Sequence, residues 1–253
     1  MSTLFSLDGR TALVTGASRG IGRALAEGLA AHGADVICHS SQSGGARETI
    51  HAIQAMGRRA WGVAADVSDR ASLHAMIEQV GEAVGDVHIL VNNAGTIRRA
   101  PAATHPMDDW DTVLRTNLDA TWYLCQHFGA AMVTRTSGKI INIASLLSFQ
   151  GGITVPGYTA SKHAVAGLTK ALANEWGAHQ VQVNAIAPGY FATDNTAPLR
   201  DDAQRAPQIL SRIPAGRWGS PADLIGAAVF LASSASDYVN GHLLVVDGGW
   251  LAR

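Results

Sequence analysis

Short apolar segments alternate with helix-forming stretches along the whole chain, and this alternation restricts the possible folds more than any other feature. The sequence predicts strands over residues 11–15, 35–39, 60–65, 88–91, 139–144, 181–187 and 243–246. Strands that are separated by helices pair in parallel, and their helices cover both faces of the sheet. We therefore expect an α/β fold whose doubly wound, mostly parallel sheet has about seven strands.

Size and composition are consistent with one globular domain that spans residues 1–253. Of the 253 residues, 47% are hydrophobic and 15% are charged, and neither a repeat nor a low-complexity linker divides them. The formal net charge of -1 gives no basic face for nucleic acid or an anionic membrane. No apolar run reaches the ~18 residues that span a bilayer. We expect neither partner, and a cytoplasmic location.

The two cysteines and ten histidines show no metal-ligand spacing. Cys38 falls in a predicted strand and Cys125 in a predicted helix, so we expect both to be reduced thiols in the core. We expect no metal site.

A glycine-rich turn follows the first predicted strand and leads into a helical pattern. Gly16, Gly20 and Gly22 follow a G-x-x-x-G-x-G spacing, with Ser18, Arg19 and Ile21 between them. Glycines at such a place permit a tight turn and let a pyrophosphate approach backbone N–H groups at the positive end of the helix. The strand before and the helix after this turn favour a dinucleotide site.

Polar or small residues also stand at the ends of later strands. The second strand ends at Ser40 without the acidic residue that would bind an adenosine ribose, and Arg19 lies in the nearby turn, so NADP is allowed. Asp66, before Val67, suits either a turn or a hydrogen bond to adenine. The segment Asn92–Gly95 suits a ribose lying against the backbone, or is only an Asn-rich turn.

Tyr158 and Lys162 lie four residues apart at the start of a predicted helix, and therefore share one face. A cation beside a phenol favours the phenolate, which would bring the pKa of Tyr158 toward neutrality and let it exchange a proton with an alcohol or carbonyl. Ser145, at the end of the fifth strand, could steady a substrate oxygen or only form a turn. Asn117 interrupts a predicted helix over 107–135, where it either bends the helix and holds a water or faces solvent.

The ordered set of these motifs resembles the short-chain dehydrogenase/reductase family over nearly the whole chain. The set comprises TGASRGIG at 15–22, Asp66-Val67, NNAG at 92–95, Asn117, Ser145, Tyr158-x-x-x-Lys162 and Pro188-Gly189. The resemblance implies a Rossmann-like fold, with residues 1–137 mainly binding the cofactor and residues 138–253 supplying catalytic residues and a substrate lid. We expect this lid over residues 190–221, with one short helix near 203–212. The resemblance also implies a homotetramer.

The same resemblance implies a role for each motif. Tyr158 would be the general acid/base, Ser145 would bind the reacting oxygen, Lys162 would lower the pKa of Tyr158 and bind the nicotinamide ribose, and Asn117 would anchor a water. The implied cofactor-binding residues are Gly16, Ser18, Arg19, Gly20, Ile21, Gly22, Ser40, Asp66, Val67, Asn92, Ala94, Gly95, Tyr158, Lys162, Pro188, Gly189 and Thr193. The cofactor would be NAD or NADP, and the resemblance favours NAD.

Stretches such as TIRRAPA at 96–102 and APGYFATDNTAPLR at 187–200 resemble a branch of the family that acts on sugar acids of the 2-deoxy-D-gluconate or 2-dehydro-3-deoxy-D-gluconate type. A sugar-acid carboxylate needs a cationic partner, and Arg98 or Arg99 could bind it bidentately or merely be solvated. Gln150 and Asn195 could meet substrate hydroxyls, beside Ser145 and Tyr158.

Two other functions share parts of this pattern. A 3-oxoacyl-[acyl-carrier-protein] reductase has the same core motifs, but it would favour a dense basic surface that the sequence does not show. A non-catalytic dinucleotide sensor predicts loss of the Ser, Tyr or Lys, and all three are present.

Overall fold

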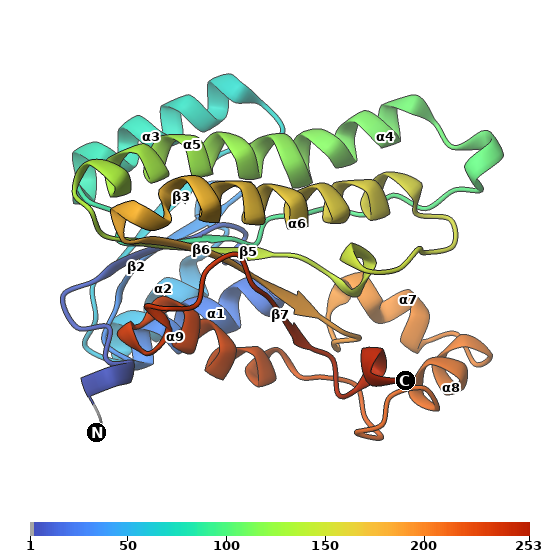
Figure 1. Ribbon diagram of the computed structural model, residues 1–253. Helices are drawn as coiled ribbons and strands as arrows, with labels where there is room; N and C mark the ends of the chain where they lie inside the picture. Colours follow the sequence, from blue (N-terminus) through green and yellow to red (C-terminus); the bar gives the residue numbers. More distant parts are fainter. Residues whose placement is uncertain (1–2) are drawn as a thin grey trace.

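The computed structural model describes residues 3–253 and contains one seven-stranded sheet in which every pair of neighbouring strands is parallel (Figure 1). The strand order is β3-β2-β1-β4-β5-β6-β7. The strands are β1 (Thr11–Val14), β2 (Asp35–Ser40), β3 (Ala60–Ala64), β4 (Ile89–Asn92), β5 (Gly138–Ile143), β6 (Val181–Pro188) and β7 (Leu243–Val246). The predicted doubly wound α/β fold is confirmed.

Helices cover both faces of this sheet (Figure 1). On one face lie α3 (Arg70–Val84), α4 (Met107–Leu114), α5 (Ala120–Thr134) and α6 (Pro156–Trp176). The other face carries α1 (Gly20–Ala31), α2 (Arg47–Ala55) and α9 (Ile225–Ala232). Two short helices, α7 (Ala197–Arg200) and α8 (Arg205–Leu210), lie beyond the carboxyl ends of the strands.

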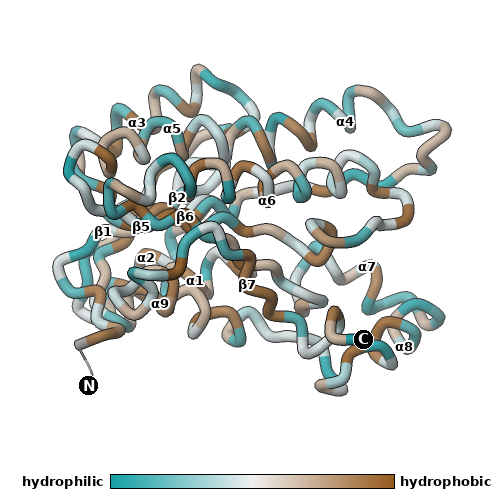
Figure 2. Tube along the Cα trace, in the orientation of Figure 1, coloured by the Kyte–Doolittle hydropathy of each residue, from teal (hydrophilic) through white to brown (hydrophobic). Residues whose placement is uncertain are grey.

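The strands are buried on both faces because their side chains alternate between two apolar layers. Leu13 packs with the residues of α3, α5 and α6, whereas its neighbour Val14 packs with those of α1 and α9. Figure 2 shows hydrophobic residues along the strands and hydrophilic residues on many of the outer turns. Because every pair of neighbouring strands is parallel, all the strand carboxyl ends lie at one edge of the sheet.

Two helical segments differ from the predictions. The helix expected over 107–135 is divided by a π-helical turn at Arg115–Asp119, which contains Asn117. The segment after β6 carries two short helices rather than one. Helix ends depend on capping and on packing between elements, so the periodicity of the sequence locates such boundaries poorly.

Both cysteines are free and buried, as predicted, and burial raises the pKa of each thiol to about 12. Over residues 3–253, none of the helices combines the length and the apolar character needed to cross a membrane.

Candidate active site

A cavity of about 630 Å³ lies at the carboxyl ends of the strands and contains most of the predicted site residues. In a parallel sheet this edge is where ligands bind, because the strand order reverses there. The predicted residues that line the cavity are Gly16, Ser18, Arg19, Gly20, Ile21, Gly22, Ser40, Asp66, Val67, Ala94, Gly95, Arg98, Ser145, Tyr158, Lys162, Pro188, Gly189, Thr193 and Asn195. Asn92, Arg99, Asn117 and Gln150 are not part of the lining.

The glycine-rich turn forms an open cradle at the start of α1. Gly16 has a left-handed backbone (φ +65°), and a Cβ on Gly22 would lie only 2.1 Å from the Gly16 carbonyl oxygen. The first turn of α1 has neither a side-chain cap nor an acidic residue, so its N–H groups remain available. This cradle and the positive end of the helix fit the pyrophosphate of a dinucleotide.

Asp66 serves a turn and also faces the cavity. Its Oδ1 accepts hydrogen bonds from the Ser68 N–H at 2.9 Å and from the Ser68 hydroxyl at 2.7 Å, and these bonds lower the pKa of the carboxyl group. The next helix is capped by Asp69, whose carboxylate accepts from the Ser72 N–H. Only one carboxylate oxygen of Asp66 therefore forms the turn, and the other remains for a ligand.

Tyr158 and Lys162 come from the first turns of α6, which begins at Pro156. Pro is well suited to a first helical position, and it fixes where the helix starts. The Lys162 ammonium lies 5.6 Å from the centre of the Tyr158 ring and donates to the Ile143 carbonyl oxygen at 2.6 Å. The shared helix face thus brings both groups to the end of β5.

The pKa of Tyr158 is shifted in the opposite direction from our expectation. Burial raises it above its ordinary value, against smaller lowering effects of the Ser145 hydroxyl and the Arg99 charge. Burial also lowers the pKa of Lys162 to about 8. The expected shift of the Tyr158 pKa toward neutrality is wrong for the protein alone, because desolvation of the phenolate outweighs the Ser145 hydrogen bond and the attraction to Arg99.

Ser145 and Asn117 frame this pair from two other elements. Ser145 accepts from the Leu147 N–H at 3.2 Å, so it caps the short turn Leu146–Ser148 while it also lines the cavity. Asn117 is buried, and its amide bonds both backbone groups of Thr96 and the Ser161 hydroxyl. The Asn117 side chain therefore joins α6 to the segment after β4, and it does not face solvent.

The four predicted substrate residues outside the catalytic group differ in whether their side chains already have a partner within the protein. Arg98 is paired with Asp109 at 3.4 Å, and Gln150 faces the Trp250 indole N–H at 3.5 Å. Arg99 is exposed and forms no ion pair with any residue of the described chain, yet its charge acts on Tyr158. Asn195 lines the cavity. Arg99 and Asn195 are thus the residues still free to meet a ligand.

Comparison with known proteins agrees with this geometry. A family model described as enoyl-(acyl carrier protein) reductase matches residues 16–251. The 2-dehydro-3-deoxy-D-gluconate 5-dehydrogenase of Pseudoalteromonas atlantica is 54% identical over 98% of each chain.

The chain belongs to the short-chain dehydrogenase/reductase family.

Two solved members of the family share the fold closely. One, from Agrobacterium tumefaciens, is provisionally described as a 2-deoxy-D-gluconate 3-dehydrogenase with bound NADP; it is 52% identical over 100% of both chains, with a TM-score of 0.93. The gluconate 5-dehydrogenase of Burkholderia cenocepacia, in complex with NADP and tartrate, is 43% identical over 99% of this chain and 98% of that one, with a TM-score of 0.95. As a dehydrogenase of this family, the present chain is an NAD(P)-dependent oxidoreductase that acts on CH–OH groups.

Sequence reasoning missed two residues that build the cofactor end of this short-chain dehydrogenase. Buried His39 accepts from the Gly16 N–H through Nδ1 and bonds the Ala65 carbonyl through Nε2, each at 3.1 Å. Asn93 donates from its amide to the Thr15 and Gly16 carbonyl oxygens. The two polar residues thus hold the glycine turn against the ends of β3 and β4.

Asn92, by contrast, lies away from the cavity. Its amide donates to Asn142 at 2.9 Å and to the Cys125 sulfur at 3.2 Å, inside the layer next to α5. Successive residues of a strand point to opposite faces, so Asn92 and Asn93 cannot both face the cofactor. The NNAG motif alone did not show which of the two does.

Proposed function

We propose that this protein interconverts a secondary alcohol and a ketone on a sugar acid of the 2-deoxy-D-gluconate or 2-dehydro-3-deoxy-D-gluconate type. The observation that carries the proposal is the exposed guanidinium of Arg99, which has no ion-pair partner in the described chain and whose charge acts on Tyr158. A sugar acid offers both the carbonyl that Tyr158 would protonate and the carboxylate that Arg99 would bind. The relative from P. atlantica, at 54% identity, supports the same substrate class.

Tyr158 is the proposed general acid and base. Because its pKa is raised, the phenol is protonated at neutral pH and can donate a proton to the carbonyl oxygen during reduction. Ser145, beside the same hydroxyl, would bind that oxygen and keep it aligned. A bound NAD(P) supplies or accepts the hydride at its nicotinamide ring.

Lys162 and Asn117 would support this step from α6 and the π-helical turn. With a pKa near 8, Lys162 stays mostly protonated at neutral pH and can bind a ribose hydroxyl at the end of β5. The Asn117 amide is already engaged with Thr96 and Ser161, so a water at this position would need the backbone as its anchor. We therefore assign the Asn117 side chain a positioning role.

Both dinucleotides are proposed to serve as cofactors. The resemblance favours NAD, whereas β2 ends at Ser40 with no carboxylate that would repel a 2'-phosphate. Arg19, at the edge of the cavity, is the proposed partner of that phosphate. The ratio of kcat/KM for NAD and NADP at one fixed substrate concentration measures the preference.

The substrate class is tested by a screen of sugar acids, neutral ketones and β-ketoacyl thioesters, followed by nicotinamide absorbance. We expect turnover of the sugar acids, and Arg99→Ala should raise their KM by roughly 10–100-fold, as for loss of a charged hydrogen bond, with little change for a neutral ketone. Arg98→Ala is the matched control, because Arg98 already bonds Asp109.

Equal effects of the two variants on the sugar acid, or equal effects of Arg99→Ala on both substrates, would exclude Arg99 as the carboxylate partner. Preference for the thioesters would instead indicate an acyl-carrier-protein reductase.

A further inference from the structure

A second cavity, of about 480 Å³, lies at the amino ends of the strands, on the opposite edge of the sheet from the candidate active site. Its lining comes from the start of the chain, the ends of α5 and α9, and the first residues of β4, β5 and β6. A volume of this size is typical of sites for small molecules. None of the residues with proposed roles in hydride or proton transfer contributes to it.

Four hydrogen-bond donors follow one another along this edge. Arg10 precedes β1, His88 precedes β4, Lys139 lies on β5 and Gln182 on β6, and these four strands are neighbours in the sheet. Lys139 and Gln182 are direct partners in the register, so their side chains point to the same face. The Arg10 guanidinium reaches the Ser137 hydroxyl at the start of β5, at 3.3 Å.

One of the two cationic side chains in the lining has no ion-pair partner among the described residues. Lys139 pairs with Asp237 at 2.8 Å and Arg135 with Asp86 at 3.2 Å, whereas Arg10 forms no ion pair with any residue in the range 3–253. The remaining acidic residue of the lining, Asp8, has a mostly exposed side chain that lies 3.7 Å from Arg58. Arg10 is therefore the cation of the lining that remains free to pair with a ligand.

Two buried or half-buried donors are also left without partners. The Gln182 residue is only 6% exposed, and its amide has no hydrogen-bond partner in the described chain. His88 accepts from the Thr11 N–H through Nδ1, and burial lowers its pKa, so its hydrogen is on Nε2, which has no partner among residues 3–253. Neither side chain belongs to the fully enclosed polar groups of the described chain, so both donors face the open cavity, where a ligand can accept their hydrogen bonds.

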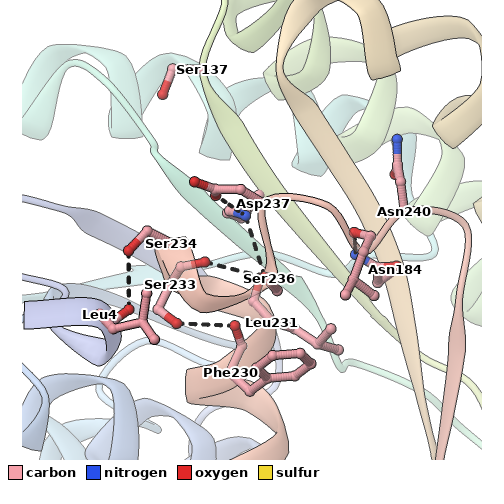
Figure 3. A network of polar contacts seen from close by, with 12 residues as sticks. Leu4, Ser137, Asn184, Phe230, Leu231, Ser233, Ser234, Ser236, Asp237 and Asn240 are labelled. Atoms are coloured by element: carbon pink, nitrogen blue, oxygen red, sulfur yellow. Dashed lines mark hydrogen bonds and ion pairs between the residues drawn. The ribbon is translucent and has the colours of Figure 1, made fainter. Parts of the chain in front are cut away.

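The turn after α9, which contributes Ser233 and Ser234 to the lining, is held by its own hydrogen bonds (Figure 3). Ser233 donates to the Phe230 carbonyl oxygen at 3.0 Å and Ser234 to that of Leu4 at 3.1 Å. Fully buried Ser236 bonds the carbonyl oxygens of Leu231 and Ser233. These serine hydroxyls donate to the backbone, so the turn after α9 is held in place before any ligand binds.

We propose that this cavity is a binding site for a small-molecule oxyanion, whose phosphate or carboxylate group lies between Arg10, Lys139 and Gln182. An oxyanion accepts several hydrogen bonds at once and can pair with the Arg10 guanidinium. The site is separate from the proposed reaction, so activity measured without such an anion does not depend on it.

The test uses the holoenzyme saturated with NADP, so that anions cannot occupy the cofactor cavity. Thermal unfolding is followed with inorganic phosphate or with succinate, each compared with chloride at equal ionic strength. Binding should raise Tm by roughly 3–6 °C when the anion exceeds its Kd tenfold. Arg10→Gln and Gln182→Met should each abolish this shift, and the exposed Arg70→Gln should retain it. If Arg10→Gln or Gln182→Met fails to fold, the other variant still tests the proposal.

A shift with phosphate alone identifies a phosphate site, and a shift with succinate alone identifies a carboxylate site. Either result, or both together, supports the proposal when the cavity variants lose the shift. No shift above chloride in the parent, or an equal shift in the parent and all three variants, overturns it.

Discussion

At the scale of single residues, burial shifts the pKa values of Tyr158 and Lys162. These shifts fit the proposed proton transfer, but they cost free energy of folding. Burial disfavours the charged form of each group, so the phenol pKa rises and the ammonium pKa falls. The Lys162 ammonium is almost fully buried and has one hydrogen bond, to the Ile143 carbonyl oxygen. A cation with so few partners costs folding free energy at neutral pH.

Replacing Lys162 by Met should therefore abolish activity and stabilise the fold at pH 7. The shift of the Lys162 pKa from 10.5 to about 8 corresponds to a cost of roughly 3 kcal/mol for the charged ammonium in the folded protein. The substitution removes this cost, but it also removes the hydrogen bond to the Ile143 carbonyl oxygen, which stabilises the fold by about 1 kcal/mol. The sign follows from proton binding: below pH 8 both states are charged and the native state bears the full penalty, which vanishes as pH rises toward 10.5.

Chemical unfolding at two pH values measures this difference. Lys162→Met should exceed the parent in free energy of unfolding at pH 7, and by less as pH rises above 8. Lys170→Met replaces an exposed residue of the same helix, and its free energy of unfolding should differ little from that of the parent at either pH. A Lys162→Met protein that unfolds more easily than the parent at pH 7 would refute the penalty.

At the scale of elements, the cofactor cradle depends on how closely α1 approaches β1. Gly22 lies in the first turn of α1, against the Gly16 carbonyl oxygen and the Asn93 amide. No side chain fits between the helix and the turn at this point. The cradle and the seating of α1 on the sheet are therefore one structural feature.

Gly22→Ala should weaken NADP binding about tenfold or more and destabilise the fold by about 1–3 kcal/mol, as other overpacked sites do. Gly81→Ala is the matched control within another helix, because a Cβ there would contact nothing within 4 Å. Helix propensity predicts that this second change stabilises the protein by about 0.5–1 kcal/mol. Fluorescence titration with NADPH and thermal unfolding of both variants provide the comparison, and unchanged cofactor affinity in Gly22→Ala would contradict the close approach.

Much of this level of structure could be predicted from the sequence, because it depends on local pattern. Hydrophobic periodicity located all seven strands, and the glycine spacing located the turn before α1. The sequence could not show that His39 and Asn93 hold that turn, because their partners are distant in the chain. The pairing of Arg98 with Asp109 and the raised pKa of Tyr158 likewise depend on packing between elements.

At the scale of the whole molecule, two distant segments meet across the mouth of the cofactor cavity. Arg19 of the glycine turn pairs with Asp194, after β6, at 2.8 Å. Both side chains are more than 70% exposed, so the pair itself contributes little to stability. It does, however, occupy the arginine that we propose binds the 2'-phosphate of NADP.

Asp194→Asn should therefore release Arg19 and raise the ratio of kcat/KM for NADP over NAD several-fold, with a change in free energy of unfolding below about 1 kcal/mol. Steady-state kinetics with both cofactors measure the ratio. Asp201→Asn, at an exposed residue of the same region, is the control. An unchanged or lower preference for NADP would show that Asp194 does not compete for Arg19.

The predicted homotetramer stays a prediction at this scale. Trp250 is buried within its own chain, where its ring centre lies 4.7 Å from that of Tyr190 and 3.9 Å from the Arg212 guanidinium carbon.

The central claim is that the Tyr158 hydroxyl transfers the proton while the cavity binds a dinucleotide and a sugar acid. The most direct test is the single-turnover rate of Tyr158→Phe with saturating NADPH and a 2-dehydro-3-deoxy-D-gluconate-type substrate, together with the Kd for NADPH. We expect the rate to fall by roughly 10²–10⁴-fold and the Kd to change little. A rate within a factor of about two of the parent would contradict the claim.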